Sequence, residues 1–261
     1  MRYWLVMPAA GSSQRFGGGR RKQFAPLAGT TVVDLALQPF LRDARCLGAI
    51  LVLAADDAGG ANDAGGASGA GADGSGGVGV GSGTTATPLL RVAGGARRCD
   101  SVLRGLEALA ARAAAEDWVL VHDAARPCLS SADLEQLLAA GEGHAVGALL
   151  AARVSDTVKQ AAEAAPAAPA AHSGCTVDRE RLWRALTPQM FRYGALCAAL
   201  RAAIASGRAP TDEAQAFEWQ GMRPLLVPAQ YSNIKITTAE DLVIAEALLA
   251  ARRAAAAMGE A

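Results

Sequence analysis

The chain has 261 residues, and its 25 basic and 25 acidic residues leave no net charge at pH 7. This length favours one α/β domain over residues 1–261, and the balanced charge argues against nucleic acid as a partner. No apolar run reaches the length of a membrane span and no signal-peptide pattern opens the chain, so we expect no membrane partner and a cytoplasmic location. The five cysteines are widely spaced and odd in number, which is typical of reduced thiols.

Short apolar segments alternate with amphipathic segments along the chain, and they predict strands and helices respectively. Strands are expected at Trp4–Met7, Ala49–Leu53, Leu89–Ala93, Trp118–His122 and Val146–Val154. Helices are expected at Thr31–Leu41, Asp100–Ala115, Ala132–Ala140, Leu196–Ala205 and Ala239–Ala257. This alternation predicts an α/β fold with a mostly parallel, twisted sheet and helices on both of its faces.

The loop after the first predicted strand is rich in small residues. It begins with Pro-Ala-Ala-Gly at residues 8–11 and carries Arg15 and Lys22. Small residues let the backbone approach a ligand closely, and exposed N–H groups bind anions. We therefore expect a site for nucleotide phosphates, with a flexible basic surface loop as the alternative. The loop has neither the Gly-Lys-Ser/Thr of a Walker A motif nor the glycine spacing of a dinucleotide-binding motif.

Two further segments follow predicted strands. Because ligands of parallel sheets bind beyond the carboxyl ends of the strands, we expect the loop after Met7, the Gly94–Ser101 segment and the His122–Pro127 segment on one rim. Asp123 is suited to face hydroxyls or a magnesium ion, and Arg126 to pair with it or to reach a phosphate. A plain Asp–Arg turn that ends the strand is the alternative.

Two predicted helix starts carry polar residues that have two explanations. Backbone groups at residues 94 and 95 can recognise a base or a ribose, but N-capping by Asp100 or Ser101 explains the same sequence. Thr211 precedes an Asp-Glu pair at the start of another helix, where capping is again a sufficient explanation.

Two low-complexity segments do not fit a compact core. Glycine makes up 12 of the 25 residues in 59–83, which predicts a disordered insert after the second strand. Residues 160–171 are rich in alanine and proline, and we expect them at the tip of an excursion over residues 153–181. Neither segment requires a function.

Eight motifs occur in the order and rough spacing found in one enzyme family. On these motifs the chain resembles the 2-C-methyl-D-erythritol 4-phosphate cytidylyltransferases of the non-mevalonate isoprenoid pathway. The resemblance covers nearly the whole chain outside the low-complexity segments and the tail. The motifs are Pro-Ala-Ala-Gly-x-x-x-Arg (8–15), Lys-Gln-Phe (22–24), Gly-Gly-x-x-Arg-x-x-Ser-Val (94–102), His-Asp-Ala-Ala-Arg-Pro (122–127), Asp-Thr-Val-Lys (156–159), Thr-Val-Asp-Arg-x-x-Leu-Trp-x-Ala-Leu-Thr-Pro-Gln (176–189), Thr-Asp-Glu-Ala (211–214) and Asn-Ile-Lys-Ile-Thr (233–237).

The resemblance implies a Rossmann-like nucleotidyltransferase domain with a protruding dimerisation arm. It implies a reaction between CTP and 2-C-methyl-D-erythritol 4-phosphate, which gives the CDP-linked alcohol and pyrophosphate. Positioning and charge stabilisation should dominate such a phosphoryl transfer. Mg²⁺ would be held mainly by the CTP phosphates, and no residue is assigned as a metal ligand.

The resemblance also implies roles for individual residues. Arg15 and Lys22 would stabilise the transition state, while Arg179 and Lys235 would position the acceptor phosphate. The contacts to the methylerythritol part would come from Asp123, Arg126, Thr157 and Thr211. The nucleotide-binding residues would be Pro8, Ala9, Ala10, Gly11, Gly95 and Ser101.

In this family the excursion is an arm that exchanges between two subunits. The arm of this chain would run over residues 153–181, so that Thr157 and Arg179 complete the site of the partner in a homodimer. Two departures bear on the site, because the family often has Glu where Arg97 stands and an acidic residue where Ser232 stands. The loss of these charges is expected to affect the orientation of Arg98 or Lys235.

Three alternative functions remain open at this stage. A ribitol or ribulose 5-phosphate cytidylyltransferase would share the fold and the CTP site. A nucleotide-binding regulatory protein without turnover would lack Arg15 or Lys22, which this chain has. An NAD-dependent oxidoreductase is disfavoured by the glycine spacing.

Overall fold

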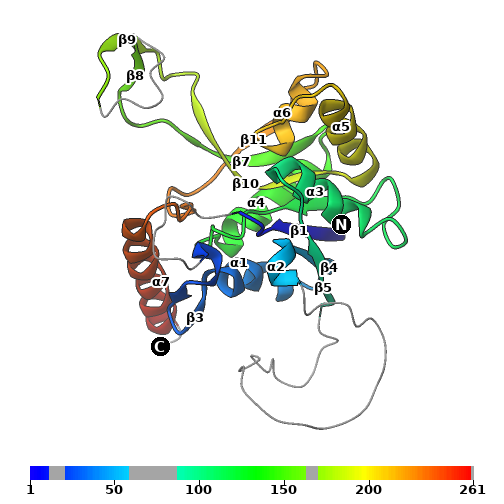
Figure 1. Cartoon of the computed structure of the whole chain (residues 1–261). Coiled ribbons are helices and arrows are strands. Elements are labelled where there is room, and N and C mark those ends of the chain that lie inside the picture. The colour runs from blue at the N-terminus through cyan, green and yellow to red at the C-terminus, as the bar shows by residue number, and fades with distance from the viewer. Residues whose placement is uncertain (12–20, 59–86, 163–169, 260–261) are drawn as a thin grey trace.

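The computed structural model of the chain describes residues 1–11, 21–58, 87–162 and 170–259. Its centre is a seven-stranded sheet in the order β11-β7-β10-β6-β1-β4-β5 (Figure 1). Strand β10 runs antiparallel to both of its neighbours, and the other neighbouring pairs are parallel, which confirms the mostly parallel sheet. The strands are β1 (Tyr3–Pro8), β4 (Cys46–Leu53), β5 (Leu89–Ala93), β6 (Trp118–Val121), β7 (Gly147–Arg153), β10 (Trp183–Arg192) and β11 (Leu225–Pro228).

Strands β10 and β11 are the two strands of this sheet that the sequence pattern does not predict. Arginines lie near both ends of β10, and Pro188 interrupts it, which argues against a central strand. The ladder between β10 and β7 is irregular between Ala185 and Gln189, where this proline lies. β11 is a four-residue edge strand that ends at Pro228, as is common for edges that must not pair further.

Helices cover both faces of the sheet, as expected. On one face α1 (Val32–Leu41) and α4 (Ser131–Glu142) pack over the buried side chains of the central strands. On the other face α3 (Arg98–Glu107), α5 (Tyr193–Ala205) and α6 (Glu213–Glu218) form a second core. The central strands β1 and β6 contribute side chains to both cores, which explains why their sequences are almost continuously apolar.

Helix α3 begins two residues earlier and ends eight residues earlier than its predicted range. The alanine-rich sequence after Glu107 has high helix propensity, but tertiary contacts override it. The Asp117 carboxylate accepts hydrogen bonds from the Ala114 backbone N–H at 2.9 Å and from the Trp4 indole at 3.2 Å. These bonds fix a turn that leads directly into β6.

The last helix, α7 (Ala239–Gly259), attaches to the body through a small third core. Ala245 of α7 and Ile236 pack in this core against Leu27 and Val32. The Ile236 backbone N–H also donates to the Ala125 carbonyl at 2.8 Å. The segment before α7 is thereby held beside the loop that follows β6.

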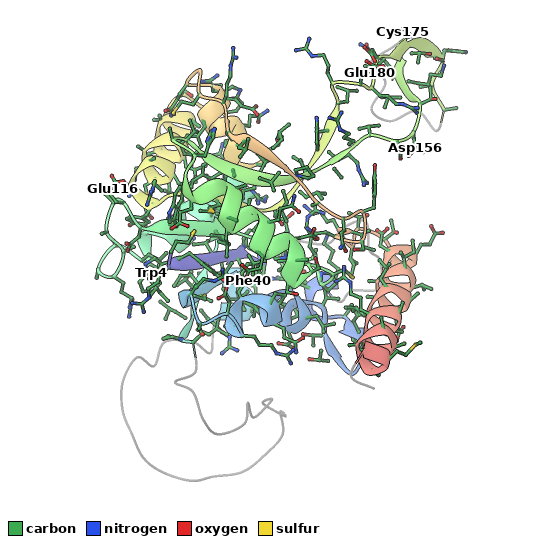
Figure 2. All side chains as sticks on the ribbon, turned by 180° about the vertical axis from the view of Figure 1, so that it is seen from behind. Trp4, Phe40, Glu116, Asp156, Cys175 and Glu180 are labelled. Carbon is green, nitrogen blue, oxygen red and sulfur yellow. The ribbon has the colours of Figure 1, made fainter. Side chains whose placement is uncertain are left out.

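A two-stranded hairpin projects from the body of the molecule. It consists of β8 (Val158–Ala161) and β9 (Ser173–Val177), and it extends from the ends of β7 and β10 (Figure 1). Seen from behind, Asp156 and Cys175 lie on this projection, away from Phe40 in the body (Figure 2). Most side chains of the hairpin are exposed, in contrast to the buried strands of the central sheet.

The remaining elements are short: η1 (Lys22–Phe24), β2 (Pro26–Leu27), β3 (Thr30–Thr31) and α2 (Ala55–Ala58). The predicted Gly-rich insert at 59–83 lies outside the described residues, as does most of the Ala/Pro-rich tip. Within the described part of the chain, no helix combines the length and the apolar character that crossing a membrane requires.

Candidate active site

A cavity of about 350 Å³ opens at the carboxyl ends of β1, β5 and β6. The three loops that the sequence places on one rim all contribute to it. Its lining consists of Pro8, Ala9, Ala10, Gly11, Lys22, Gln23, Gly95, Ala96, Arg97, Arg98, Ser101, Asp123, Ala124, Ala125 and Lys235. The lining contains four cations and one carboxylate, so the cavity is suited to an anionic ligand.

Two glycines after β5 allow close packing, Gly94 against the loop after β1 and Gly95 against the first turn of α3. A Cβ atom on Gly94 would lie 2.7 Å from the Ala10 Cβ, and one on Gly95 would lie 2.5 Å from the Asp100 Cβ. Both positions therefore require glycine. The Ser101 hydroxyl accepts a hydrogen bond from the Gly95 backbone N–H at 3.1 Å, which fixes the turn at the start of α3.

Lys22 reaches the cavity from the single turn of η1. The next residue, Gln23, is buried and donates its side-chain N–H to the Ala9 carbonyl at 2.5 Å. This bond ties Gln23 to the start of the loop that follows β1. Lys22 is thus placed on the same side of the cavity as the small residues 9–11.

Asp123 lies at the centre of a cluster of positive charges. Its Oδ1 accepts from Arg98 Nη2 at 3.0 Å, its Oδ2 accepts from Lys235 Nζ at 2.9 Å, and Arg126 Nε lies 3.7 Å from Oδ2. Burial by itself raises the pKa of Asp123, but the three cations outweigh it and hold the pKa well below its usual range. Asp123 is therefore a permanent anion that organises the three cations.

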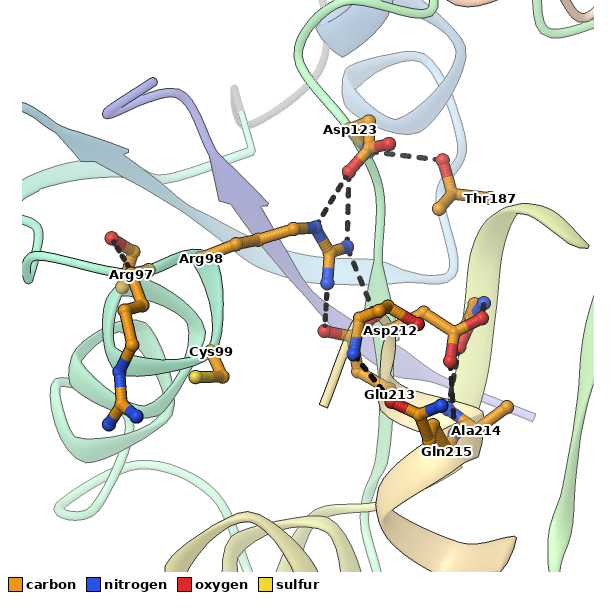
Figure 3. Close-up of polar contacts among 12 residues, drawn as sticks. Arg97, Arg98, Cys99, Asp123, Thr187, Asp212, Glu213, Ala214 and Gln215 are labelled. Atoms are coloured by element: carbon orange, nitrogen blue, oxygen red, sulfur yellow. Dashed lines mark hydrogen bonds and ion pairs between the residues drawn. The ribbon is translucent and has the colours of Figure 1, made fainter. Parts of the chain in front are cut away.

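Arg98 connects Asp123 to a second, fully buried carboxylate. Its Nη1 donates to Glu213 Oε1 at 2.6 Å, and its Nη2 donates to Glu213 Oε2 at 3.1 Å (Figure 3). Burial raises the pKa of Glu213, and the neighbouring guanidinium only partly offsets this. The same guanidinium bonds Asp123 on its other side.

A buried hydrogen-bond chain fixes the backbone around Asp123. The Asp123 N–H donates to Thr187 Oγ1 at 3.0 Å, and the Thr187 hydroxyl lies 3.0 Å from His122 Nδ1. His122 Nε2 lies 3.1 Å from the Arg126 carbonyl, which can only accept. These partners assign the proton of a neutral His122 to Nε2. Burial lowers the pKa of His122 to about 4, in agreement with the neutral form.

Asn233 joins this chain to the Lys235 segment. Its side-chain N–H donates to the Thr187 carbonyl at 2.8 Å, and its backbone carbonyl accepts from Arg126 Nη1 at 2.8 Å. The loop after β6, strand β10 and the segment before α7 are therefore bonded to one another on one side of the cavity.

The comparisons with known proteins agree with this geometry. A family model described as IspD, 2-C-methyl-D-erythritol 4-phosphate cytidylyltransferase, matches residues 3–251. The chain belongs to this cytidylyltransferase family. Membership makes it a nucleotidyltransferase, and it does not favour the ribitol or ribulose alternative, the regulatory protein or the oxidoreductase.

Relatives of the same name are similar to the chain over almost its full length. The Acidithiobacillus ferrooxidans 2-C-methyl-D-erythritol 4-phosphate cytidylyltransferase is 47% identical over 254 residues, which cover 96% of this chain and 98% of the relative. The Halorhodospira halophila protein of the same name is 46% identical over 255 residues, which cover 97% and 96%.

Solved structures of cytidylyltransferases share the fold. The Francisella tularensis 2-C-methyl-D-erythritol 4-phosphate cytidylyltransferase superposes with a TM-score of 0.73 at 27% identity, covering 95% of this chain and all of the other. A 4-diphosphocytidyl-2C-methyl-D-erythritol synthase superposes with a TM-score of 0.71 at 31% identity, covering 95% and 98%. The Rossmann-like nucleotidyltransferase fold inferred from the cytidylyltransferase motifs is thereby confirmed.

The structure brings most of the sequence-predicted cytidylyltransferase residues to the cavity. Arg126 lies directly behind its wall, against Asp123. The predicted residues in the lining are Pro8, Ala9, Ala10, Gly11, Lys22, Gly95, Ser101, Asp123 and Lys235.

Besides Arg126, three of the predicted residues that the structure describes are not in the lining, namely Thr157, Arg179 and Thr211. Thr157 precedes β8 and Arg179 follows β9, so both belong to the projecting arm, where the Arg179 guanidinium donates to the Ser155 carbonyl. Thr211 precedes α6, and its backbone N–H donates to Gln215 Oε1 at 2.9 Å. Arg15 lies outside the described residues.

Sequence reasoning assigned no role in the site to Glu213, His122, Thr187 or Asn233. Each of them stands inside one of the quoted motifs, which is the signal that could have identified them. Their importance comes from burial and from hydrogen bonds between distant segments, and neither is visible in a local pattern.

The two departures from the family pattern leave the central ion pairs in place. Arg97 pairs with Asp100 at 2.7 Å on the exposed start of α3, while Arg98 is held separately. Ser232 Oγ accepts a hydrogen bond from Arg252 Nη2 of α7 at 2.6 Å. An effect of these two departures on the orientation of Arg98 or Lys235 stays a prediction.

Proposed function

We propose that the chain transfers the cytidylyl group of CTP to 2-C-methyl-D-erythritol 4-phosphate, giving 4-diphosphocytidyl-2-C-methyl-D-erythritol and pyrophosphate. The observation that carries this proposal is the cavity at the carboxyl ends of the parallel strands. It combines four cations with the backbone of glycine and alanine residues, in a chain of the cytidylyltransferase family.

The reaction needs no nucleophile from the protein. An oxygen of the acceptor phosphate attacks the α-phosphorus of CTP and forms a new P–O bond. The bond between the α-phosphorus and the bridging oxygen breaks, and its electron pair leaves with pyrophosphate. Lys22 and Arg15 stabilise the negative charge that grows on the phosphoryl oxygens, because fixed cations in a cavity act most strongly where charge develops.

The remaining residues bind and orient the two substrates. Residues 8–11 with Gly95 and Ser101 hold the nucleotide. Lys235 and Asp123, which are paired at 2.9 Å, face the acceptor side of the cavity with Arg126 behind them. Thr211, which precedes α6 and is not in the cavity lining, is proposed to contact the acceptor as well.

We propose that magnesium is bound mainly by the triphosphate oxygens of CTP and not by a site made of protein side chains. In the described part of the chain, no group of three or more His, Cys, Asp or Glu side chains is placed to hold a metal ion. The Asp123 carboxylate is already engaged by three cations. A single carboxylate that is already paired with cations fits a magnesium ion whose ligands are mainly substrate oxygens and water. When bound, Mg²⁺ supplies neutralisation of the phosphate charge.

We also propose that two chains form a homodimer and exchange their arms. The support is that Thr157 directly precedes β8 and Arg179 follows β9 of the projecting hairpin, which Figure 1 shows, and that neither residue is in the lining of its own cavity. The partner's Thr157 and the partner's Arg179 would complete the acceptor side of the site.

The five cysteines are free thiols, which supports a cytoplasmic location.

The direct test is pyrophosphate release from CTP with each candidate acceptor in parallel. We expect release with 2-C-methyl-D-erythritol 4-phosphate and little release with ribitol 5-phosphate or ribulose 5-phosphate. A folded sample that consumes CTP only with a pentitol or pentulose phosphate would contradict the proposed acceptor. One that never consumes CTP would contradict the proposed activity.

A further inference from the structure

Glu213 is a buried carboxylate to which the proposed function gives no role. Its side chain is 1% exposed, and both of its oxygens accept from the Arg98 guanidinium, at 2.6 and 3.1 Å. Arg98 donates on its other side to Asp123 Oδ1, through Nε at 3.1 Å and Nη2 at 3.0 Å. The guanidinium is therefore clamped between carboxylates from two different elements (Figure 3).

The backbone around Glu213 is held by one side chain of β10. Gln189 Nε2 donates to Asp212 Oδ2 at 2.9 Å, and Gln189 Oε1 accepts from the Ala214 N–H at 2.9 Å. Asp212 also caps α6, since its Oδ1 accepts from the Gln215 N–H at 2.9 Å. The residues on both sides of Glu213 are thus fixed, so its carboxylate offers Arg98 a stationary anchor.

This anchor determines which oxygen of Asp123 remains for other cations. Arg98 occupies Oδ1, and Thr187 holds the Asp123 backbone N–H at 3.0 Å. Oδ2 is left to Lys235 at 2.9 Å and to Arg126 at 3.7 Å. Lys235 is the exposed member of this row, with 40% of its side chain accessible at the cavity.

We propose that Glu213 is a positioning residue for the acceptor side of the cavity. It keeps Arg98 on Asp123, so that Asp123 in turn holds the Lys235 ammonium toward the acceptor phosphate. The inference rests on the proposed function. Without the Glu213 charge, the Arg98 guanidinium is no longer held on Asp123, and the direction of Lys235 is no longer fixed.

The first test compares Glu213→Gln with Glu218→Gln, which makes the same change at an exposed position of the same helix. Because a charge-assisted hydrogen bond is lost, kcat/KM for the acceptor should fall about tenfold to hundredfold in Glu213→Gln. The KM for CTP should stay within about threefold, since only the acceptor side is disturbed. Glu218→Gln should match the wild type. Equal losses for both substrates, or no loss, would overturn the proposal.

The second readout is the pH profile, which a purely structural role would leave unchanged. Glu213 faces Arg98 from α3, Asp123 from the loop after β6 and Asp212 from its own turn. Burial raises the pKa of Glu213, so acid removes the same charge that Glu213→Gln removes. The wild-type advantage in kcat/KM for the acceptor should therefore shrink as the pH is lowered. A constant ratio between the two proteins would contradict the role.

Arg98→Lys decides the question if Glu213→Gln does not fold, as judged by circular dichroism. Lysine keeps the charge but lacks the planar fork that bridges two carboxylates. The same selective loss toward the acceptor is expected, and unchanged acceptor kinetics would overturn the inference. A wild type that releases no pyrophosphate would overturn the proposed function itself. An active wild type with unaltered Glu213→Gln kinetics would overturn only this inference.

Discussion

The cavity and the projecting arm hold their polar residues in opposite ways. Around the cavity, Asp123 and Glu213 are buried, and each is gripped by partners from distant elements. On the arm, Thr157 and Arg179 are exposed, and the contact made by the Arg179 guanidinium is with the neighbouring Ser155 carbonyl. One region is organised by the fold of its own chain, whereas the other presents its residues outward. The difference supports the proposal that the arm acts by contact with a partner subunit.

The largest expected effect is at the cavity, in Lys22→Ala. Removal of a cation aimed at the developing charge should lower kcat by about 10²–10³-fold, with the thermal midpoint unchanged. Arg21→Ala is the matched control, because that neighbouring guanidinium pairs with Asp56 and Asp57 outside the cavity lining. Pyrophosphate release and thermal melting measure the two quantities. Near-normal turnover in Lys22→Ala would contradict the proposed role of Lys22 in catalysis.

The second prediction concerns the pH dependence of stability. The pKa of His122 is about 4 in the folded chain, below the unfolded value of about 6.5. Between these values the unfolded state binds a proton that the folded state does not, so stability falls with falling pH. The loss reaches about 3 kcal/mol at about pH 4. Urea unfolding should show this slope in the wild type, and His122→Asn should flatten it.

The arm provides the control for that experiment. His172 is exposed on the arm, and His172→Asn makes the same substitution there. An equal flattening in both variants would show that the slope does not come from the buried His122 imidazole.

A smaller effect is expected for the arm residue itself. Loss of one charged contact to a phosphate, in Arg179→Ala, should raise the KM for the acceptor about tenfold or more, with the KM for CTP unchanged. Arg181→Ala, an exposed arm variant of the same type, should have little effect. Steady-state kinetics with each substrate varied in turn would reveal the difference.

Mixing Arg179→Ala with Lys22→Ala chains tests whether the arm serves a second subunit. If arms exchange, each mixed dimer has one intact site, and random pairing should restore about a quarter of the wild-type activity. If subunit exchange is verified and no activity is recovered, each arm serves the site of its own chain.

The smallest effect is expected at the rim. Arg97 is in the cavity lining, but its guanidinium is exposed to solvent and already paired with Asp100 in the first turn of α3. Because exposed charges are screened by water, Arg97→Glu should change kcat and either KM by no more than about twofold. A large change in either constant would mean that the rim is coupled to Arg98 after all.

The sequence predicted the parts of the site that depend on local chemistry. Small residues after β1, paired glycines before α3 and an Asp–Arg turn after β6 each indicate a ligand site, and sheet topology brings them together. Strand β10 was missed because its Thr-Pro pair reads as a turn. The contacts of Thr187 and Gln189 within that strand were missed with it, since they depend on burial against segments far away in the chain.

The roles of Thr157 and Arg179 depend on a different kind of information. Their segment has neither the apolar run nor the periodicity that marks the core, so only the family resemblance suggested a function for them. The structure of one chain fixes where they stand, but their proposed target lies in another chain.

The attachment of α7 has a consequence for the biosynthesis of the protein. Residues 8–11 leave the ribosome first, while Lys235 and the helix that anchors its segment are made near the end of the chain. A nascent polypeptide therefore carries the loop proposed to bind the nucleotide long before it carries the ammonium proposed to face the second substrate. Competence for the transfer should arise abruptly, once α7 has been made and has docked.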